Sequence, residues 1–386
     1  MRCVALLTTL FVAAPAAGKT YYPAGRVVSP VTPDVASTLR TIAERRPRQE
    51  DVFAKVGCSI TASLSFMRCF TGKRVRLDKW ENLSPTIEHF RFGDADGTDP
   101  FRRRSVAAVS GWSALHTLRG EPSPLDAELE AIDPRFALVM YGTNDIERCD
   151  IDEYAENLFA IVAHLVEEGV VPIVSTIPPR DDRLRSDRWV PAYNGVVRAV
   201  AQAHQVPLVD FHLAVDALKR HGLGPDRLHP STWRPRKRAR ACDFRPSGLR
   251  HGYNRRNLVT LAALDIVRRV VVDGEPAPDP PHPFPDAGGT ADDPIPVHAL
   301  PFTDHDKTGG VVYSLKLERP TLIEAYVLDL GDDELKLRLL ADPSDPPATL
   351  AEADTRIEAS LAPGTWQFAV DGWGDYLFVV VESRAE

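Results

Sequence analysis

The stretch FALVMYGTND, residues 136–145, decides the fold, because a continuous apolar run ends there in a glycine and three polar residues. An apolar run of strand length without polar alternation predicts a strand buried on both faces, as in a parallel sheet. The sequence contains four further runs of this kind: VFAKVG (52–57), SVAAVSG (105–111), VPIVSTIPP (171–179) and VPLVDF (206–211). We therefore predict a parallel sheet built from these five runs.

Amphipathic helices are predicted between and after these strands. Residues 152–169 and 191–205 place apolar side chains three and four positions apart, and Gly169 is a typical helix stop. Residues 255–274 show a third pattern of this kind. Strands that alternate with helices over residues 50–274 predict a doubly wound α/β domain, which binds ligands at the carboxyl ends of its strands.

A second, all-β domain is predicted near the C-terminus. Residues 275–291 are rich in proline and indicate a semi-rigid linker. Residues 292–386 contain short, partly alternating apolar runs separated by turn residues, which is the pattern of a small β-sandwich. These runs are VVYSLKL (311–317), TLIEAYVLDL (321–330), LKLRLLAD (335–342), TRIEASL (355–361), TWQFAVDG (365–372) and YLFVVVES (376–383).

The N-terminus is typical of a secretory signal peptide. Residues 1–18 combine an early arginine, an apolar stretch from Val4 to Ala14 and small residues suited to cleavage. The apolar stretch is too short to span a bilayer. We expect residues 19–49 to form an N-terminal extension of a soluble protein exported to the periplasm or the medium, without an integral membrane segment.

The charge balance argues against general nucleic-acid binding. The formal net charge is −8, and the 44% apolar fraction fits a soluble globular chain with room for two domains. Two basic clusters, RRR (102–104) and RPRKRAR (234–240), interrupt the acidic balance. We expect both to be solvated loops, and an anion-binding patch is the alternative.

Three polar signals follow predicted strands. Ser59 comes after Gly57-Cys58 at the start of a predicted helix, where unpaired N–H groups favour a developing negative charge. Gly111 can bring its backbone N–H close to a reacting carbonyl. Asn144 offers a side-chain amide to the same oxygen. The three residues predict an oxyanion hole formed by Ser59, Gly111 and Asn144.

A fourth signal is the turn-rich segment GPDRLHP, residues 224–230. Asp226 and His229 lie three apart, so the carboxylate can orient the imidazole, and the imidazole can deprotonate Ser59. Taken singly, each signal has a plain structural explanation, since a serine that opens a helix is usually a cap. Their convergence at one edge of the sheet predicts a catalytic triad of Ser59, Asp226 and His229.

This set of residues resembles the SGNH (GDSL-type) hydrolase family. Ser59, Gly111, Asn144 and His229 match its four sequence blocks, and Asp226 completes its Asp-x-x-His element. The resemblance covers about residues 50–272 and implies a flavodoxin-like three-layer α/β/α fold. It also implies hydrolysis of carboxylic esters through an acyl-enzyme. Family substrates include acetylated polysaccharides, lysophospholipids, thioesters and small acyl esters.

The sequence departs from the family pattern in two places. Cys58 stands where the family usually has an aspartate. A thiolate at this position could compete as the nucleophile, but the resemblance points Ser59 at the substrate. Residues 231–249 form a longer connection than in small family members, and we expect it to lie over the pocket. Residues 292–386 resemble the pre-peptidase C-terminal type of β-sandwich; its Trp366 and Trp373 could stack on sugars, although core packing is the commoner use.

Four cysteines follow the predicted signal, and four cysteines allow three pairings. Cys149 and Cys242 each follow a predicted site residue closely, so we predict a disulfide between them. A straight helix over residues 59–69 would separate Cys58 from Cys69 by about 15 Å. A disulfide needs α-carbons closer than about 7 Å. We therefore expect Cys58 and Cys69 to be reduced, unless that helix is short.

The resulting hypothesis is an exported serine esterase that removes O-acyl groups, acetyl above all, from a polysaccharide or a similar ester. A lysophospholipase or lipase-like esterase is the first alternative. A non-catalytic carbohydrate-binding or surface-interaction protein on the same scaffold is the second. No cofactor or metal is expected, since the sequence has neither zinc-ligand spacing nor a phosphate-binding glycine loop. The oligomeric state is left open.

Overall fold

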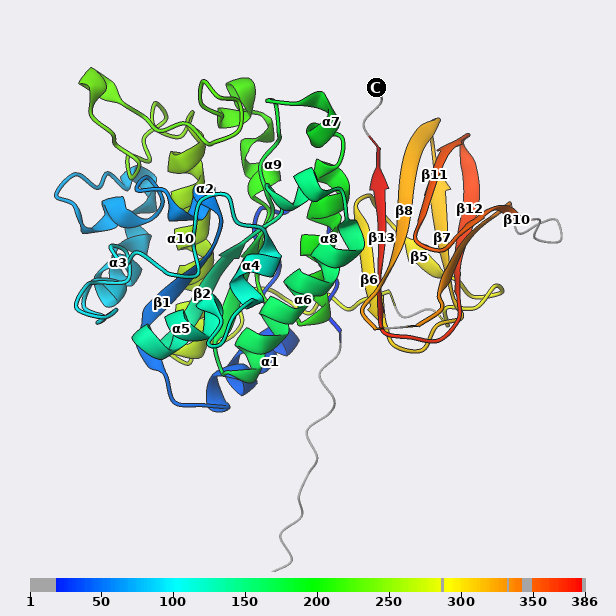
Figure 1. Ribbon diagram of the computed structural model, residues 1–386, viewed down its shortest axis with the longest axis horizontal. Helices are drawn as coiled ribbons and strands as arrows, with labels where there is room; N and C mark the ends of the chain where they lie inside the picture. Colours follow the sequence, from blue (N-terminus) through cyan, green and yellow to red (C-terminus); the bar gives the residue numbers. More distant parts are fainter. Residues whose placement is uncertain (1–18, 286–287, 332, 342–348, 384–386) are drawn as a thin grey trace, which may run out of the picture.

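The computed structural model describes residues 19–285, 288–331, 333–341 and 349–383. The predicted signal peptide, residues 1–18, lies outside these residues. An α/β part and an all-β part stand side by side (Figure 1). Across the described ranges, no helix combines the length and the apolarity needed to cross a membrane.

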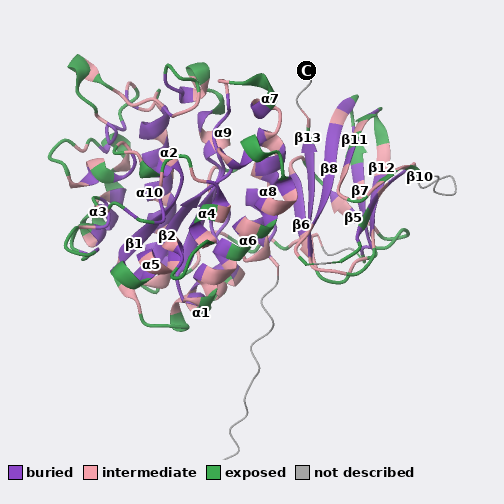
Figure 2. Ribbon diagram, in the orientation of Figure 1, coloured by how far each residue is buried: buried purple, intermediate pink, exposed green. Residues whose placement is uncertain are grey.

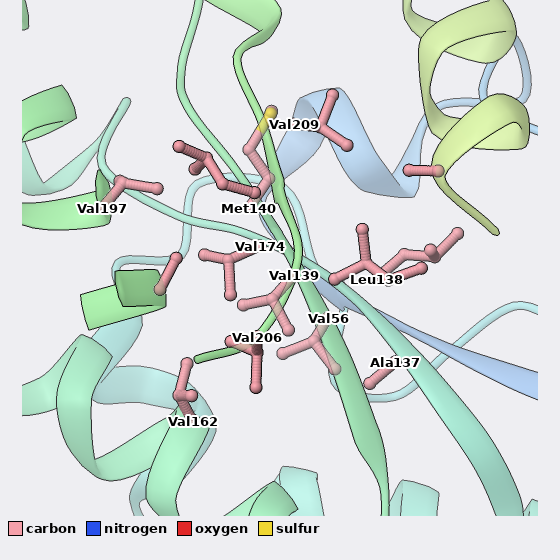
Figure 3. Close-up of a cluster of buried hydrophobic side chains, with 14 of the residues drawn as sticks. Val56, Ala137, Leu138, Val139, Met140, Val162, Val174, Val197, Val206 and Val209 are labelled. Carbon is pink, nitrogen blue, oxygen red and sulfur yellow. The ribbon is translucent and has the colours of Figure 1, made fainter. Parts of the chain in front are cut away.

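A four-stranded parallel sheet forms the centre of the α/β part, in the order β1-β2-β3-β4. Its strands are β1 (Gln49–Gly57), β2 (Pro134–Met140), β3 (Val171–Ser175) and β4 (Leu208–Val209). Apolar side chains from these strands, among them Val56, Val139 and Val174, pack in one buried cluster (Figure 3). The parallel α/β sheet expected from the continuous apolar runs is therefore confirmed.

The predicted strand at residues 105–111 is not formed. Ala108 makes only an isolated parallel bridge to Gly57, at the outer edge of β1. Residues 101–103, which precede this segment, are bound by a side chain. The buried Lys55 ammonium donates to the carbonyl oxygens of Phe101 and Arg103. The chain that leads into residues 105–111 is therefore attached to β1 by a side chain and not by a backbone ladder.

Two layers of helices accompany the sheet. Figure 2 shows buried residues on the helix faces that point inward. Within one layer, α6 packs against both α4 and α8, and α4 packs against α5. Within the other, α10 packs against α1, α3 and α9. Gly169, the predicted helix stop, has a φ of 72° just after α6. The α-helices are α1 (Pro33–Glu44), α2 (Ser59–Ala62), α3 (Ser84–Arg91), α4 (Ala114–Leu118), α5 (Pro124–Ile132), α6 (Ile151–Glu167), α7 (Leu184–Asp187), α8 (Val190–Ala203), α9 (Phe211–Asp216) and α10 (Gly252–Val271).

The all-β part consists of two packed sheets. One has the order β10-β9-β12-β7-β5, and the other has the order β11-β8-β13-β6. Trp366 packs against the core between them, whereas Trp373, in the turn after β12, is 77% exposed, so core packing was wrong for Trp373. The strands are β5 (Ile295–Val297), β6 (Phe302–Asp306), β7 (Val311–Leu317), β8 (Thr321–Asp329), β9 (Lys336–Leu340), β10 (Thr349–Ala353), β11 (Arg356–Leu361), β12 (Gly364–Asp371) and β13 (Tyr376–Glu382).

Strand β13 joins the two parts because it is buried on both faces (Figure 2). Alternate side chains, such as Tyr376 and Phe378, enter the sandwich core. The others, such as Leu377 and Val379, belong to the core of the α/β part. On α8, a Cβ at Gly195 would lie 2.4 Å from Val379 Cγ1, so the helix approaches the sheet closely.

The described start of the proline-rich segment, residues 275–285, contacts the N-terminal extension. The Asp279 carboxylate accepts a hydrogen bond from the Val31 N–H at 2.8 Å. The neighbouring residues Tyr21 and Tyr22 then lie in different cores, the first in the sandwich and the second in the α/β part. The N-terminal extension therefore fastens the two parts together.

The predicted Cys149–Cys242 disulfide is wrong. Cys242 pairs with Cys69, with α-carbons 5.6 Å apart, while Cys149 is free and exposed and Cys58 is free and buried. The pairing is possible because α2 ends at Ala62, so no long helix carries Cys69 away from the site. Residue 69 lies in a separate 3-10 helix. The 3-10 helices are Arg68–Thr71, Asp78–Leu83, Asp145–Arg148, Lys219–Gly222 and Pro235–Lys237.

The disulfide should contribute strongly to stability, because it closes a loop of 173 residues. Cys242→Ser is expected to lower the free energy of unfolding by about 2–5 kcal/mol. Cys149→Ser, which removes a free exposed thiol, should change it by less than about 0.5 kcal/mol. Urea unfolding followed by circular dichroism measures both values. Equal stability of the two variants would contradict the assigned pairing.

A charge placed between α8 and β13 should destabilise both parts together. Val379→Asp buries a carboxylate in the shared core and is expected to cost more than about 3 kcal/mol. Lys316→Asp on the exposed face of β7 should stay within about 0.5 kcal/mol of the parent. Differential scanning calorimetry should show one transition that shifts as a whole. Two transitions, of which only one moves, would show that the parts unfold independently.

Candidate active site

Ser59 is the first residue of α2 and follows the carboxyl end of β1 almost directly. Gly57 makes this turn possible, because a Cβ there would lie 2.5 Å from Thr61 Oγ1 and 2.6 Å from the Met140 carbonyl oxygen. The N-cap position belongs to Cys58, and it makes no side-chain capping bond. Ser59 is thus not a capping serine, and its hydroxyl group is available for another partner.

The partner of the Ser59 hydroxyl is the imidazole of His229. Ser59 Oγ lies 2.8 Å from His229 Nε2, and His229 Nδ1 lies 2.8 Å from Asp226 Oδ2. The other Asp226 oxygen accepts the backbone N–H groups of Leu228 and His229 at 3.2 and 3.1 Å. Partial burial raises the pKa of Asp226. The hydrogen bonds from the His229 ring and from these N–H groups lower it by more, so the net pKa lies below its usual value. The carboxylate is therefore held ionised beside the ring.

The segment that carries this pair is a closed turn. The Gly224 N–H donates to the His229 carbonyl oxygen at 2.7 Å, and Leu223 forms a bridge with Pro230. Backbone pairing on both sides of the turn fixes the spacing between Asp226 and His229. The structure thus brings three of the predicted site residues into one hydrogen-bonded chain.

Asn144 is connected to Gly111 through Trp112, the residue that follows Gly111 in the chain. The Asn144 side-chain amide donates to the carbonyl oxygen of Trp112 at 2.8 Å. Gly111 has a φ of 84°, a left-handed conformation that favours glycine. An amide nitrogen has two hydrogens, so Asn144 retains a second donor after bonding to Trp112.

Asp145 connects these two loops. Its buried carboxylate accepts the Ala114 N–H at 2.8 Å and the Gly142 N–H at 2.9 Å. Burial raises the pKa of Asp145, while the hydrogen bonds from the backbone oppose this. One side chain therefore joins the end of β2 to the start of α4 and fixes the position of Asn144 relative to Gly111.

Cys58 is not presented to the site. The residue is 1% exposed, and burial is the main cause that raises the pKa of its thiol. A raised pKa keeps the sulfur protonated, and only a thiolate is an effective nucleophile. Burial of the Cys58 thiol and the hydrogen bond between Ser59 and His229 therefore both favour Ser59 as the candidate nucleophile.

Sequence reasoning missed Arg256, which lies on α10. Its guanidinium donates to the Ile60 carbonyl oxygen at 2.7 Å and to Thr61 Oγ1 at 2.9 Å, and it lies 3.7 Å from the centroid of the Phe66 ring. Burial lowers its pKa to about 10, so it remains charged at neutral pH. Arg256 is a positioning residue that holds the short helix behind Ser59. No sequence signal distinguishes it from the other arginines of the closing helix.

A second missed residue is Arg180, which follows β3. It donates to the Thr143 carbonyl oxygen at 2.6 Å, and it pairs with Glu147 and Asp182 at 2.6 and 2.9 Å. Because Thr143 directly precedes Asn144, this buried cation supports the loop that carries the amide. Its sequence signal is weak, since an arginine after a strand is ordinarily a surface residue.

A cavity of about 330 Å³ opens between α2 and the loop at residues 101–108. Ala62, Leu64 and Ala108 contribute apolar surface to it, and several arginines line the rest. Within the described parts of the chain, no three His, Cys, Asp or Glu side chains are grouped so that they could hold a metal ion.

One family model matches part of the chain. Residues 91–233 match the model of the GDSL-like lipase/acylhydrolase family, a range that includes Gly111, Asn144, Asp226 and His229 and begins after Ser59. A search of curated proteins returns no match.

Among solved structures, the chain is similar to a GDSL-like lipase from Bacteroides thetaiotaomicron, with 14% identity over 60% of this chain and 98% of that chain and a TM-score of 0.36. A catalytic mutant of an acetylxylan esterase from Geobacillus stearothermophilus gives 17% identity over 55% and 93% of the two chains, with a TM-score of 0.36. A psychrotrophic esterase from Pseudoalteromonas sp. gives 20% identity over 47% and 87%, with a TM-score of 0.31.

Removing the guanidinium of Arg256 should loosen α2. Arg256→Met is expected to lower the free energy of unfolding by about 2–3 kcal/mol, because the Ile60 carbonyl loses a charged donor. Arg256→Lys should recover part of this loss, and Arg250→Met, at an exposed neighbouring position, should have little effect. Urea unfolding measures the stability, and hydrogen exchange reports on the α2 amides. Unchanged exchange in Arg256→Met would rule out the positioning role.

Proposed function

We propose that the α/β part is a carboxylic ester hydrolase of the GDSL-like lipase/acylhydrolase family, whose model matches residues 91–233. We further propose that Ser59 is its nucleophile. The observation that carries the proposal is the continuous hydrogen-bonded chain from Ser59 through His229 to Asp226, with both contacts at 2.8 Å. Such a chain allows the imidazole to remove the hydroxyl proton while the carboxylate stabilises the resulting imidazolium.

In the first half of the reaction, Ser59 Oγ attacks the ester carbonyl carbon and His229 Nε2 takes the proton. The carbonyl oxygen becomes an oxyanion that accepts the backbone N–H groups of Ser59 and Gly111 and the second amide hydrogen of Asn144. The C–O bond to the alcohol then breaks, and His229 returns the proton to the leaving oxygen. The product is an acyl-serine and a free alcohol.

Water completes the cycle. His229 removes a proton from a water molecule, whose oxygen attacks the acyl-serine carbonyl. The same donors hold the second oxyanion. When the C–O bond to Ser59 breaks, the proton on His229 passes to Ser59 Oγ, and the carboxylic acid leaves.

The proposed substrate is an O-acylated polysaccharide, with acetyl as the favoured acyl group. The side chains of His229 and Asp226 are 37% and 53% exposed, so the site is open enough for an acyl group attached to a long polymer. The exposed Trp373 of the sandwich offers a face on which a sugar ring could stack. These features suit a bulky, hydrated substrate better than a small ester in a closed pocket.

The same proposal places the protein outside the cytoplasm. A disulfide such as Cys69–Cys242 persists in an oxidising compartment. The sequence of residues 1–18, with its arginine, apolar stretch and small residues, supports export through a cleaved signal.

A lipid ester is the second candidate, and one observation favours it. Leu64 and Val106 are 62% and 45% exposed, and they lie on the two segments that border the cavity beside α2. Exposed apolar side chains at the mouth of a pocket could contact an acyl chain. Release of long-chain fatty acid from a lysophospholipid, without release of acetate from acetylated xylan, would favour this candidate.

Substitutions at the two adjacent residues Cys58 and Ser59 test the nucleophile. Ser59→Ala should lower kcat for p-nitrophenyl acetate by at least about 10³-fold, and Asp226→Asn by about 10²–10⁴-fold. Cys58→Ala should remain within about fivefold of the parent, since its thiol is buried and protonated.

Initial-rate kinetics of the chain without residues 1–18 give these values, with Cys149→Ser as the control for the exposed thiol. Activity lost in Cys58→Ala and kept in Ser59→Ala would overturn the assignment. Inertness of the parent on acetyl and longer esters would support a binding protein on a hydrolase scaffold.

A further inference from the structure

A large basic hollow lies away from the triad, between two loops of the α/β part. Its volume is about 610 Å³. It is lined by Arg74, Arg76, Pro235, Arg236, Arg238, Arg240, Asp243 and Arg245. Six arginines and one aspartate give this surface a local charge of +5, in a chain whose formal net charge is −8. The arginines are therefore strongly segregated.

Most of these arginines have no acidic partner. Within the described residues, Arg245 forms an ion pair with Asp243 at 2.6 Å, and the other five arginines of the hollow form none. The pKa of Arg240 is lowered by desolvation and by the charges of Arg74 and Arg238. Like charges are thus crowded together, and Asp243 is the one acidic residue among those that line the hollow.

The two loops are fastened to each other beneath the charges. The disulfide joins Cys69 to Cys242, and Arg76 forms a parallel bridge with Asp243. The Arg76 N–H donates to the Cys242 carbonyl oxygen at 2.9 Å, and its own carbonyl accepts the Phe244 N–H at 2.8 Å. A covalent bond and backbone pairing therefore hold the arginines in place against their mutual repulsion.

The hollow is connected to the candidate active site at both loops. Arg240 donates its N–H to the carbonyl oxygen of Trp233, four residues after His229, at 2.8 Å. Cys69 follows the segment that begins with Ser59, and its neighbour Arg68 lines the cavity beside α2. Figure 1 shows the yellow-green loop at residues 230–250 at the upper left, at the same end of the sheet as α2. Both loops of the hollow are therefore continuous with segments that carry predicted site residues.

We propose that this arginine hollow binds a polysaccharide that carries carboxylate groups along its chain. Guanidinium groups bind carboxylates through paired N–H donors, and several arginines in one concave surface match repeated anionic groups. A membrane surface fits less well, because none of the large exposed apolar residues of the described chain lines the hollow. Binding itself is independent of acyl transfer, whereas presentation of the polymer to Ser59 rests on the proposed function.

Calorimetric titration with polygalacturonate oligomers tests the site. The cluster variant carries Arg74→Gln, Arg236→Gln, Arg238→Gln and Arg240→Gln. A matched control removes four charges elsewhere, through Arg26→Gln, Arg46→Gln, Arg319→Gln and Lys336→Gln. Each set is made in Ser59→Ala as well as in the parent, so binding is measured without turnover.

The cluster variant is expected to raise the Kd for polygalacturonate about tenfold or more, and the control should stay within about twofold. Affinity of the parent should fall between about 20 and 300 mM NaCl, because salt screens exposed charges. Fully methyl-esterified polygalacturonate, which lacks the charge, should bind weakly to all variants. Hydrolysis of p-nitrophenyl acetate should be equal in the parent and the cluster variant, since these arginines do not touch the triad.

Equal loss of affinity in the cluster variant and the control would overturn the proposal, because only the total charge would then matter. Failure of the parent to bind polygalacturonate would overturn it as well. Cluster-dependent binding to phosphatidylglycerol vesicles or to single-stranded DNA, without binding to polygalacturonate, would assign the hollow to another polyanion and refute the polysaccharide. If polygalacturonate binds while Ser59→Ala leaves ester hydrolysis intact, the hollow stands and the proposed nucleophile fails.

Discussion

The close approach of the chain to itself at Gly57 is the constraint on which the rest of the site depends. Only a residue without a side chain fits between Thr61 and the carbonyl oxygen of Met140. The backbone of Gly57 also pairs with Ala107 and Val109 on its other side. Three chain segments therefore lie side by side at Gly57. One predicted site residue follows each of them: Ser59 follows β1, Gly111 follows the bridge at Ala108, and Asn144 follows β2.

A second constraint is that the sandwich and the α/β part share a core. An independent module would present a polar outer face to the solvent, but β13 is apolar on both faces. Val379 packs close to Gly195, and Tyr21 and Tyr22 reach into the two cores from one short segment. The α8 helix thus lies between two sheets, which limits motion of the part of the chain that follows β3.

The sequence predicted those features that depend on local composition. Continuous apolar runs identified β1 to β4, and the alternation of strands with helices identified the parallel sheet. The edge segment at residues 105–111 has the same composition but forms one bridge, because pairing depends on what surrounds an edge. Composition does not reveal that the Lys55 ammonium takes up two nearby carbonyl groups.

In the candidate site, too, local sequence predicted some residues, and tertiary contacts determined the others. Ser59, Asp226 and His229 could be grouped because each follows a recognisable turn signal, and the structure places them within hydrogen-bonding distance. Cys69–Cys242 could not be found this way, since the pairing depends on where α2 ends. The sequence pattern of residues 59–69 does not show that the helix ends at Ala62. Arg256 was missed because its function comes from burial against Ile60, which only the tertiary fold creates.

The loop that carries Arg236, Arg238 and Arg240 is held by interactions that do not involve their guanidinium groups. Asn254 of α10 is fully buried, and its amide donates to the carbonyl oxygens of Arg240 and Asp243 at 2.6 and 3.0 Å, while its oxygen accepts the Trp233 N–H at 3.0 Å. These bonds are neutral, and the disulfide is covalent, so stability of the loop does not require ion pairs. Within the described residues, Arg245 is the one arginine of the hollow that forms an ion pair, with Asp243. The guanidinium groups of Arg236, Arg238 and Arg240 therefore keep their hydrogen-bonding capacity for a ligand.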